Sequence, residues 1–218
     1  MSQPKLQYFG LAARAEPIRI ICAVKGIKFE DERLDFPDFG ARKAAGEFPM
    51  GSMPVWREDG MSIFQTNTIM RMLGQRNGMY AKDPTTGWAI DSILEYVEDE
   101  FNAWCGKAPD GSFGKPFPEG EVDALADFHG KLCVLIERRM KMHGKKWVGG
   151  TDDMSVADCK IAHMFYNNLF RDSSTLTAAQ KEKLRANLAK YPVAEKYVDQ
   201  TLRGALGAYL STRPPVPC

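Results

Sequence analysis

The chain has 218 residues, of which 44% are hydrophobic and 26% charged, values that suit one large or two small folded domains and exclude a disordered or repetitive protein. Its 29 basic and 28 acidic residues leave a formal net charge of +1, which argues against nucleic acid or an anionic membrane as the main partner. Any anion that the protein binds must therefore be held by a local site.

The reactive and metal-binding residue types form no motif. The five cysteines are odd in number and contain no C-x-x-C pair, so we expect reduced thiols rather than disulfides or a zinc site. The three histidines are too dispersed to predict a metal centre. The opening residues lack the segments of a signal peptide, and no apolar run approaches the roughly 18 residues of a membrane span. We therefore expect a cytoplasmic protein that binds no metal.

The first third of the chain predicts a small α/β unit. Residues 5–9 indicate a strand, and apolar residues at helical spacing from Arg14 onward predict a helix that Gly26 ends, with Pro17 in its first turn. Residues 27–34 indicate a second strand. The Gly-, Pro- and Ala-rich residues 36–52 predict a loop with room for one helical turn.

A hairpin and a helix complete this unit. Residues 54–56 and 62–64 indicate two strands joined by the turn residues Asp59-Gly60. Gln65-Thr66-Asn67 then opens a helix that runs through Leu73. The order strand, helix, strand, irregular segment, hairpin, helix describes an α/β domain over residues 1–76.

The rest of the chain predicts helices. Asn77-Gly78 and the turn residues that follow indicate a linker over residues 77–86, and residues 87–218 contain two long amphipathic helices typical of a bundle. Ser155 and Asp158 have the spacing of a capping box at the start of a later helix, with Met154 and Cys159 as its apolar staple.

Three features of the α/β unit could together hold a small anionic peptide. Tyr8 ends the first strand, and Gln65-Thr66 opens a helix whose free N–H groups favour a carboxylate. Between them, Met53-Pro54 at the entry to a strand is a place for a cis peptide bond, which would turn the Met53 backbone outward to pair with an extended peptide.

Several short motifs occur in an order and at spacings typical of one family. They are Tyr8-Phe9, Arg14-Ala15-Glu16-Pro17-Ile18-Arg19, Met53-Pro54-Val55, Asp59-Gly60, Phe64-Gln65-Thr66-Asn67-Thr68-Ile69 and Ser155-x-x-Asp158. With them the whole chain resembles a cytosolic glutathione transferase, and its pattern is nearest to the sigma class, the group that includes glutathione-dependent prostaglandin D synthase and the lens S-crystallins. The resemblance implies an α/β thioredoxin-like N-terminal domain that binds glutathione, followed by an all-α C-terminal domain that supplies most of the acceptor pocket. It also implies a homodimer, with glutathione as co-substrate and no other cofactor.

The resemblance implies a set of site residues. Members of the family place Tyr, Ser or Cys at the glutathione sulfur, and Tyr8 is the only hydroxyl or thiol between residues 8 and 16, so Tyr8 would act on the sulfur with Arg14 in support. The remaining glutathione contacts would come from Phe36 and Lys43 at the glycyl end, Met53 and Pro54 at the cysteinyl part, Gln65 and Thr66 at the γ-glutamyl carboxylate, and Asp99 of the partner subunit at the γ-glutamyl amine. Phe9, Trp104, His163 and Met164 would line the acceptor pocket, although a plain helix core explains them equally well.

The chemistry open to Tyr8 follows from ordinary pKa values. A free thiol has a pKa of about 8.5 and a phenol of about 10, so at neutral pH the phenol keeps its proton and can donate it to a thiolate. The thiolate would then attack an electrophilic carbon, or open a peroxide for isomerisation.

Three functions remain open from the sequence. The first is a transferase that conjugates glutathione to small hydrophobic electrophiles. The second is a glutathione-dependent isomerase of lipid endoperoxides, and the third is a non-catalytic, crystallin-like binding or structural protein. The residues also have ordinary structural interpretations, with Tyr8 as a strand aromatic, Arg14 as a surface cation and Asp99 as one of several acids on a solvated helix face.

Overall fold

The computed structural model describes residues 3–105, 119–171 and 176–213, with side chains at all of these except residues 100, 102–105 and 119. Four strands form one mixed sheet in the order β2-β1-β3-β4. They are β1 (Lys5–Phe9), β2 (Glu30–Leu34), β3 (Val55–Glu58) and β4 (Met61–Phe64). β1 lies parallel to β2 and antiparallel to β3, with Gln7 opposite Val55. The predicted strands and hairpin are confirmed.

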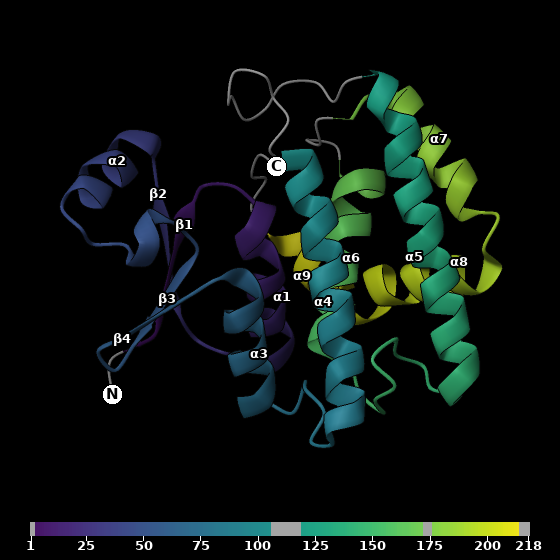
Figure 1. The fold of residues 1–218 in the computed structure, drawn as a ribbon, viewed down its shortest axis with the longest axis horizontal. Helices are drawn as coiled ribbons and strands as arrows, with labels where there is room; N and C mark the ends of the chain where they lie inside the picture. The colour runs from purple at the N-terminus through teal and green to yellow at the C-terminus, as the bar shows by residue number, and fades with distance from the viewer. Residues whose placement is uncertain (1–2, 106–118, 172–175, 214–218) are drawn as a thin grey trace.

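Three helices cover the sheet. They are α1 (Glu16–Lys25), α2 (Phe36–Ala44) and α3 (Thr66–Arg76), and the short 3-10 turns η1 (Ala13–Ala15) and η2 (Pro49–Gly51) precede α1 and follow α2. α1 and α3 lie on one side of the sheet and α2 on the other (Figure 1). As predicted, Pro17 is in the first turn of α1, and Gly26 ends it with a φ of 63° that only glycine adopts freely.

The prediction of a loop over residues 36–52 was wrong, because this segment contains α2. The carboxylate of Asp35 caps the helix by accepting a hydrogen bond from the N–H of Asp38 at 2.7 Å, and Pro37 fits the first turn. Phe39 packs against Phe48, with ring centroids 5.2 Å apart, above a small apolar cluster centred on Val55. The cap and this packing stabilise a helix that the Gly-, Ala- and Pro-rich sequence does not predict.

The second half of the described chain is helical, as predicted. Its elements are α4 (Pro84–Cys105), η3 (Glu119–Glu121), α5 (Val122–His143), α6 (Val156–Phe165), η4 (Tyr166–Phe170), α7 (Ala178–Leu188), α8 (Pro192–Asp199), η5 (Gln200–Ala205) and α9 (Gly207–Thr212). α4 begins at Pro84, three residues inside the predicted linker 77–86, because the Asp83 carboxylate accepts a hydrogen bond from the N–H of Thr86 at 2.8 Å and starts the helix.

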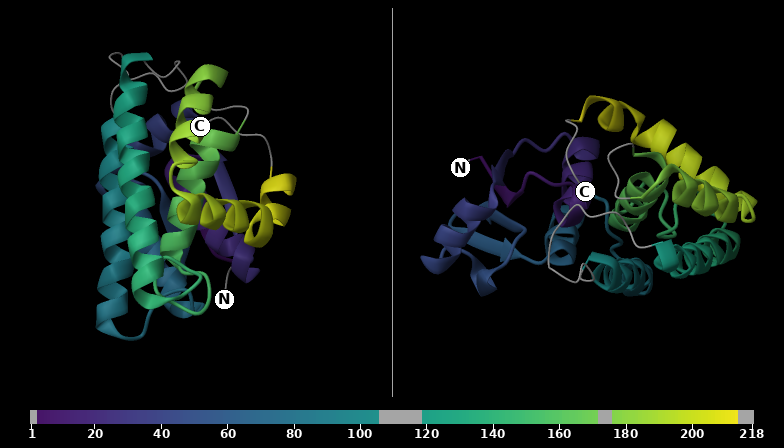
Figure 2. Two further views of the ribbon diagram at one scale, coloured as in Figure 1. Left: turned by 90° about the vertical axis from the view of Figure 1, so that its right-hand side faces the viewer. Right: turned by 90° about the horizontal axis from the view of Figure 1, so that it is seen from above.

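The two halves share one apolar core. α6 packs on α1 and α4, and the buried cluster extends from Leu6 and Ile18, through Ile90 and Val156, to Leu184. Figures 1 and 2 show α1 and α3 facing the helical half, so that these two helices form the layer between the sheet and the bundle. The position of the sheet is therefore fixed by contacts with the helical half as well as by its own pairing.

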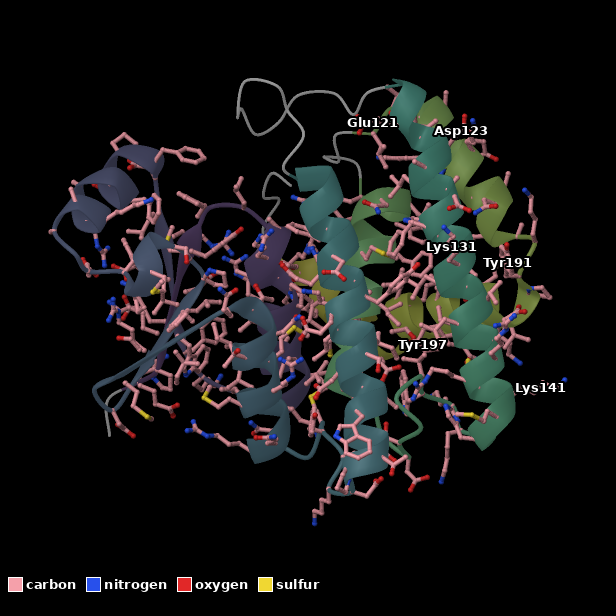
Figure 3. All side chains as sticks on the ribbon, viewed as in Figure 1. Glu121, Asp123, Lys131, Lys141, Tyr191 and Tyr197 are labelled. Carbon is pink, nitrogen blue, oxygen red and sulfur yellow. The ribbon has the colours of Figure 1, made fainter. Side chains whose placement is uncertain are left out.

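The capping box at the start of α6 is confirmed, and Asp158 is its centre. One carboxylate oxygen of Asp158 accepts hydrogen bonds from the N–H and hydroxyl of Ser155 at 2.8 and 2.6 Å. The other accepts from the N–H of Val148 at 3.0 Å and from the hydroxyl of Tyr197 at 2.6 Å. Tyr197 comes from α8, inside the bundle (Figure 3). The predicted staple is present too, since the Cys159 and Met154 sulfurs are 3.8 Å apart.

We expect Asp158→Ala to lower the free energy of unfolding by about 3–5 kcal/mol, because it leaves several buried donors without an acceptor. Asp153→Ala, which removes an exposed carboxylate from the same segment, should change it by no more than about 0.5 kcal/mol. Urea unfolding of both variants measures the difference, and equal urea midpoints would contradict the role given to Asp158.

Candidate active site

The hydroxyl of Tyr8 lies where β1 ends and the chain turns into α1. The side chain is 5% exposed, and its oxygen accepts a hydrogen bond from the main-chain N–H of Arg14 at 3.3 Å. A phenol that accepts this bond still has its own proton to donate. The fold therefore fixes the phenol oxygen at the end of β1.

The start of α3 is tied to the same turn. The hydroxyl of Thr66 donates a hydrogen bond to the main-chain carbonyl of Arg14 at 3.2 Å, so Arg14 contacts β1 with its N–H and α3 with its carbonyl. The first turn of α3 carries backbone N–H groups without intrahelical acceptors, at the positive end of the helix dipole. This end suits a carboxylate.

Gln65, immediately before α3, has an unusual backbone. Its φ of 70° and ψ of 123° lie in a region that residues with a Cβ rarely adopt, and its side chain is exposed. Strained backbone of this kind is concentrated at functional sites. The residue type gives no sign of this conformation, so the sequence could point to Gln65 only through its place before the helix.

Met53-Pro54 is a cis peptide bond, as the sequence predicts. Because Gln7 lies opposite Val55 in the sheet, Met53 comes to the end of β1 where Tyr8 lies. Met53 is half-buried and packs against both apolar clusters, while Pro54 is buried.

Sequence reasoning missed a group of charged residues that joins the helical half to this turn. Arg14 Nη1 donates to Glu98 Oε1 of α4 at 2.8 Å, and Lys160 Nζ of α6 contacts the other oxygen, Oε2, as well as Asn67 Oδ1 at 3.1 Å. Lys160 is 4% exposed; burial lowers its pKa, and the charge of Glu98 opposes this shift. The one signal in the sequence was a lysine among the mostly apolar residues of α6.

The residues predicted for the glycyl end of glutathione lie on α2. Phe36 is 53% exposed, and its ring centroid is 4.6 Å from that of Phe9 at the end of β1. The side chain of Lys43 lies over Phe39, with Nζ 5.7 Å from the ring centroid, and also against Gly51. A Cβ at position 51 would be 2.9 Å from Lys43 Cε, so glycine there lets the lysine approach the chain that leads to Met53.

The other predicted residues lie further along the chain. Asp99 is exposed on α4, and the side chain of Trp104 is outside the described part of that helix. Met164 is half-buried and packs against the core. His163 is buried, and burial lowers its pKa to about 3, with the charge of Glu16 opposing this shift. Glu98, the residue before Asp99, contacts Arg14 of the same chain.

Two cavities lie apart from the Tyr8 turn. One, of about 480 Å³, is lined by α5, Asn187 and Tyr191, and Lys131 and Tyr191 mark it on the side of the bundle that faces away from the sheet (Figure 3). The other, of about 520 Å³, lies between α1, β2 and α9. Neither is lined by Tyr8, Arg14, Met53 or Thr66.

Within the described residues, no three His, Cys, Asp or Glu side chains come together as metal ligands. In the same residues, each helix is too short or too polar to cross a bilayer.

Comparison with known sequences identifies relatives over most of the chain. The family described as "Glutathione S-transferase, N-terminal domain" matches residues 4–75. Glutathione S-transferase P 1 of Xenopus laevis is 32% identical over 212 residues, which cover 95% of this chain and 91% of that protein. Glutathione S-transferase alpha-3 of Rattus norvegicus is 28% identical over 90% of this chain and 88% of that protein. Hematopoietic prostaglandin D synthase of Gallus gallus is 35% identical over 99 residues. This match covers 45% of this chain and 49% of that protein.

Solved structures of similar proteins show the same fold. A Nu-class glutathione S-transferase of Haemonchus contortus has a TM-score of 0.79 and 22% identity, with all of both chains covered. Na-GST-3 of Necator americanus, described as monomeric, has a TM-score of 0.78 and 23% identity over 99% of both chains. At this identity the likeness shows the fold alone, a thioredoxin-like domain followed by a helical region, as predicted.

We expect Gln65→Gly to be about 1 kcal/mol more stable than Gln65→Ala, because glycine relieves a positive φ that alanine keeps. Thermal unfolding of the two variants measures this difference. A glycine variant less stable than the alanine variant would show that the backbone at this position is not strained.

Proposed function

The chain belongs to the glutathione S-transferase family, and we propose that it binds glutathione beside Tyr8 and activates the thiol as a thiolate for attack on small hydrophobic electrophiles. Enzymes of this family use glutathione as co-substrate and need no cofactor.

The hydrogen bond between the Arg14 N–H and the Tyr8 hydroxyl is the observation that carries the proposal. It holds the phenol oxygen at the end of the sheet, so the phenolic proton can be donated to a sulfur placed there. Donation stabilises the thiolate over the thiol, and each unit by which the thiol pKa falls corresponds to ~1.36 kcal/mol. A hydrogen bond to a charged acceptor near a helix N-terminus is strong enough to supply one or two such units.

The other parts of glutathione would bind to residues around the same turn. Its γ-glutamyl carboxylate would lie at the start of α3, against Gln65 and Thr66, where helix N–H groups lack partners in the helix. The Met53 main chain, beside Pro54, would pair with the cysteinyl part. Lys43 offers a cation and Phe36 an exposed ring for the glycyl end. Asp99 of the partner subunit would bind the γ-glutamyl amine.

The chemical step needs little beyond a stable thiolate. The thiol releases its proton to solvent, and the sulfur lone pair forms a bond to the electrophilic carbon. With an aryl halide, the halide then leaves with the electrons of its bond, and the product is a thioether. Phe9, Trp104, His163 and Met164 are the residues proposed to face the acceptor, which should be apolar and small.

Isomerisation of a lipid endoperoxide is the second candidate function. The 35% identity with the chicken prostaglandin D synthase favours it, although that match spans less than half of this chain. Here the thiolate would attack one peroxide oxygen and break the O–O bond, so that the other oxygen leaves as an alkoxide and takes a proton from solvent. Loss of a proton from the carbon that bears the sulfur-bound oxygen would then form the carbonyl and break the S–O bond, which releases the thiolate. An assay with a prostaglandin endoperoxide tests this function, and unchanged substrate would exclude it.

Three further properties stay predictions: membership of the sigma class, assembly as a homodimer and a cytoplasmic location. The relatives that match over most of the chain are named as P 1 and alpha transferases, so the sigma class rests on the shorter match with the synthase. Met50, which is 83% exposed, lies before Gly51, where the resemblance to the family implies a side chain that enters the partner subunit. Sedimentation at low protein concentration tests the dimer, which a monomer at micromolar concentration would exclude.

We expect Tyr8→Phe to lower kcat by about 100-fold while the affinity for glutathione changes less than about threefold, because the hydroxyl acts on the thiolate and the other contacts remain. Steady-state rates with chlorodinitrobenzene and calorimetric titration with glutathione measure the two effects.

Tyr191→Phe is the matched control, since Tyr191 lines a cavity outside the Tyr8 turn and its variant should keep wild-type rates. Full activity of the Tyr8→Phe variant would show that another group activates the sulfur.

A further inference from the structure

Helix α2 lies on the face of the sheet opposite α1 and α3, and few side chains hold it there (Figure 1). All nine residues of α2 are described, and none of them is buried. Among these nine, only Phe39 and Arg42, three residues apart and so on one side of the helix, are half-buried. Phe39 packs against Phe48, whereas Arg42 forms ion pairs. The place of α2 on the sheet therefore depends in large part on one arginine.

The guanidinium of Arg42 joins two carboxylates. Nη1 donates to Glu32 Oε1 of β2 at 3.0 Å, and Nε donates to Glu47 Oε2, in the segment after α2, at 2.6 Å. Nη2 contacts the other oxygen of Glu47, so this pair is bidentate. The guanidinium also lies over the ring of Phe48, 5.5 Å from its centroid. Bidentate contacts of this kind fix the direction of the arginine side chain as well as its distance from the acid.

Residues of the two central strands hold the same carboxylates in place. Gln7 of β1 is 1% exposed, and its Nε2 donates to Glu32 Oε2 at 2.6 Å and to Glu47 Oε1 at 3.3 Å. Its Oε1 accepts from Arg57 Nε of β3 at 2.5 Å, and Arg57 Nη2 donates to the main-chain carbonyl of Glu47 at 2.7 Å. We call Gln7, Glu32, Arg42, Glu47 and Arg57 the Arg42 network. It connects α2 to three strands of the sheet.

The Arg42 network is ionised at neutral pH. The hydrogen bonds of Arg42 lower the pKa of Glu47 to about 2, and the charges of Arg42 and Arg57 act in the same direction. Burial opposes any lowering of the Glu32 pKa, but hydrogen bonds with Arg42 and Gln7 outweigh it, so this pKa is lowered too. Both ion pairs of Arg42 are therefore present under the conditions in which ligand binding is measured.

Lys43, the residue after Arg42, lies where the position of α2 decides what its ammonium reaches. Its Nζ is 5.7 Å from the ring centroid of Phe39, and its side chain lies against Gly51, on the chain that leads to Met53. Of the proposed glutathione contacts, α2 carries the two at the glycyl end. A shift of α2 would therefore displace these contacts and leave those of the cysteinyl and γ-glutamyl parts in place.

We propose that Arg42 is a positioning residue for the glycyl carboxylate of glutathione: its pairs with Glu32 and Glu47 hold α2 where the Lys43 ammonium meets that carboxylate. The inference rests on the proposed function, because it concerns the same ligand and the same site. Arg42 itself touches no part of the ligand on this account. Its effect comes from preorganisation, since an ammonium that is already in place loses less freedom when the ligand binds.

The experiment compares two ligands by calorimetric titration: glutathione, and γ-glutamylcysteine, which lacks the glycyl residue. Arg42→Met keeps an apolar side chain over Phe48 and removes both ion pairs. We expect it to raise the Kd of glutathione by about five- to tenfold and that of γ-glutamylcysteine by less than about twofold, so that the ratio of the two affinities falls. A loss of structure around the Tyr8 turn would instead weaken both ligands alike.

A double variant tests whether Arg42 acts through Lys43. Lys43→Met alone should show the same loss, confined to glutathione. If both residues serve one contact, Arg42→Met/Lys43→Met should bind glutathione within about twofold of Lys43→Met. Losses that multiply in the double variant would overturn the inference, since Arg42 would then act on the ligand by another route.

Two further variants control for charge and folding. Arg33→Met removes an arginine of β2 that is paired with Asp31 and has nearly the same side-chain exposure, 29% against 27% for Arg42. Its affinities for both ligands should stay within about twofold of wild type. Glu47→Gln keeps the shape of the acid but not the charge that Arg42 pairs with, so it should reproduce the selective loss. It supplies the test if Arg42→Met does not fold.

The outcomes separate this inference from the function on which it rests. A wild-type protein that does not bind glutathione would overturn the proposed function and the inference with it. A wild type that binds both ligands equally would overturn the glycyl contact of Lys43, and with it the role of Arg42, but not the chemistry at Tyr8. An unchanged ratio of affinities in the folded Arg42→Met and Glu47→Gln variants, or an equal loss for both ligands, would overturn the role of Arg42 alone.

Discussion

The hydrogen bond from the Arg14 main chain to the Tyr8 hydroxyl fixes the position of the phenol, and the fold determines where that bond forms. It forms because β1 runs directly into the turn that starts α1, and Thr66 closes the same turn from α3. Each of these elements is buried on the side that faces the helical half, so the turn cannot shift without disturbing the shared core. The phenol is thus placed by the packing of two helices on a sheet, rather than by a mobile loop.

The helical half contributes to the site through α6. The capping box on Asp158 fixes where α6 begins, and Lys160 follows two residues later, on the turn of helix that meets Glu98. A helix that started one residue earlier or later would direct the lysine elsewhere, since each residue rotates about 100° around the axis. The buried hydrogen bonds of Asp158 therefore stabilise the bundle and also set the direction of a cation toward the Tyr8 turn.

Local patterns in the sequence predicted the elements that local interactions determine. Gly26 ends α1, Asp59-Gly60 makes the hairpin turn with φ of 46° and 80°, and Ser155 with Asp158 caps α6, all through contacts within a few residues. α2 was missed because Phe48, from beyond the helix, holds it against the sheet. Glu98 and Lys160 are 62 residues apart, and no spacing relates them. The acids of α4 looked like a solvated face, and only tertiary structure shows that Glu98 turns inward.

The central claim is that Tyr8 and its surroundings make the thiolate of glutathione stable at neutral pH. The most direct measurement is an ultraviolet difference spectrum of the glutathione complex, followed through a pH titration. We predict a thiolate band at neutral pH and a thiol pKa at least about one unit below the value of about 8.5 for a free thiol. A bound thiol that titrates at its free value would contradict the account, even with glutathione held at the predicted place.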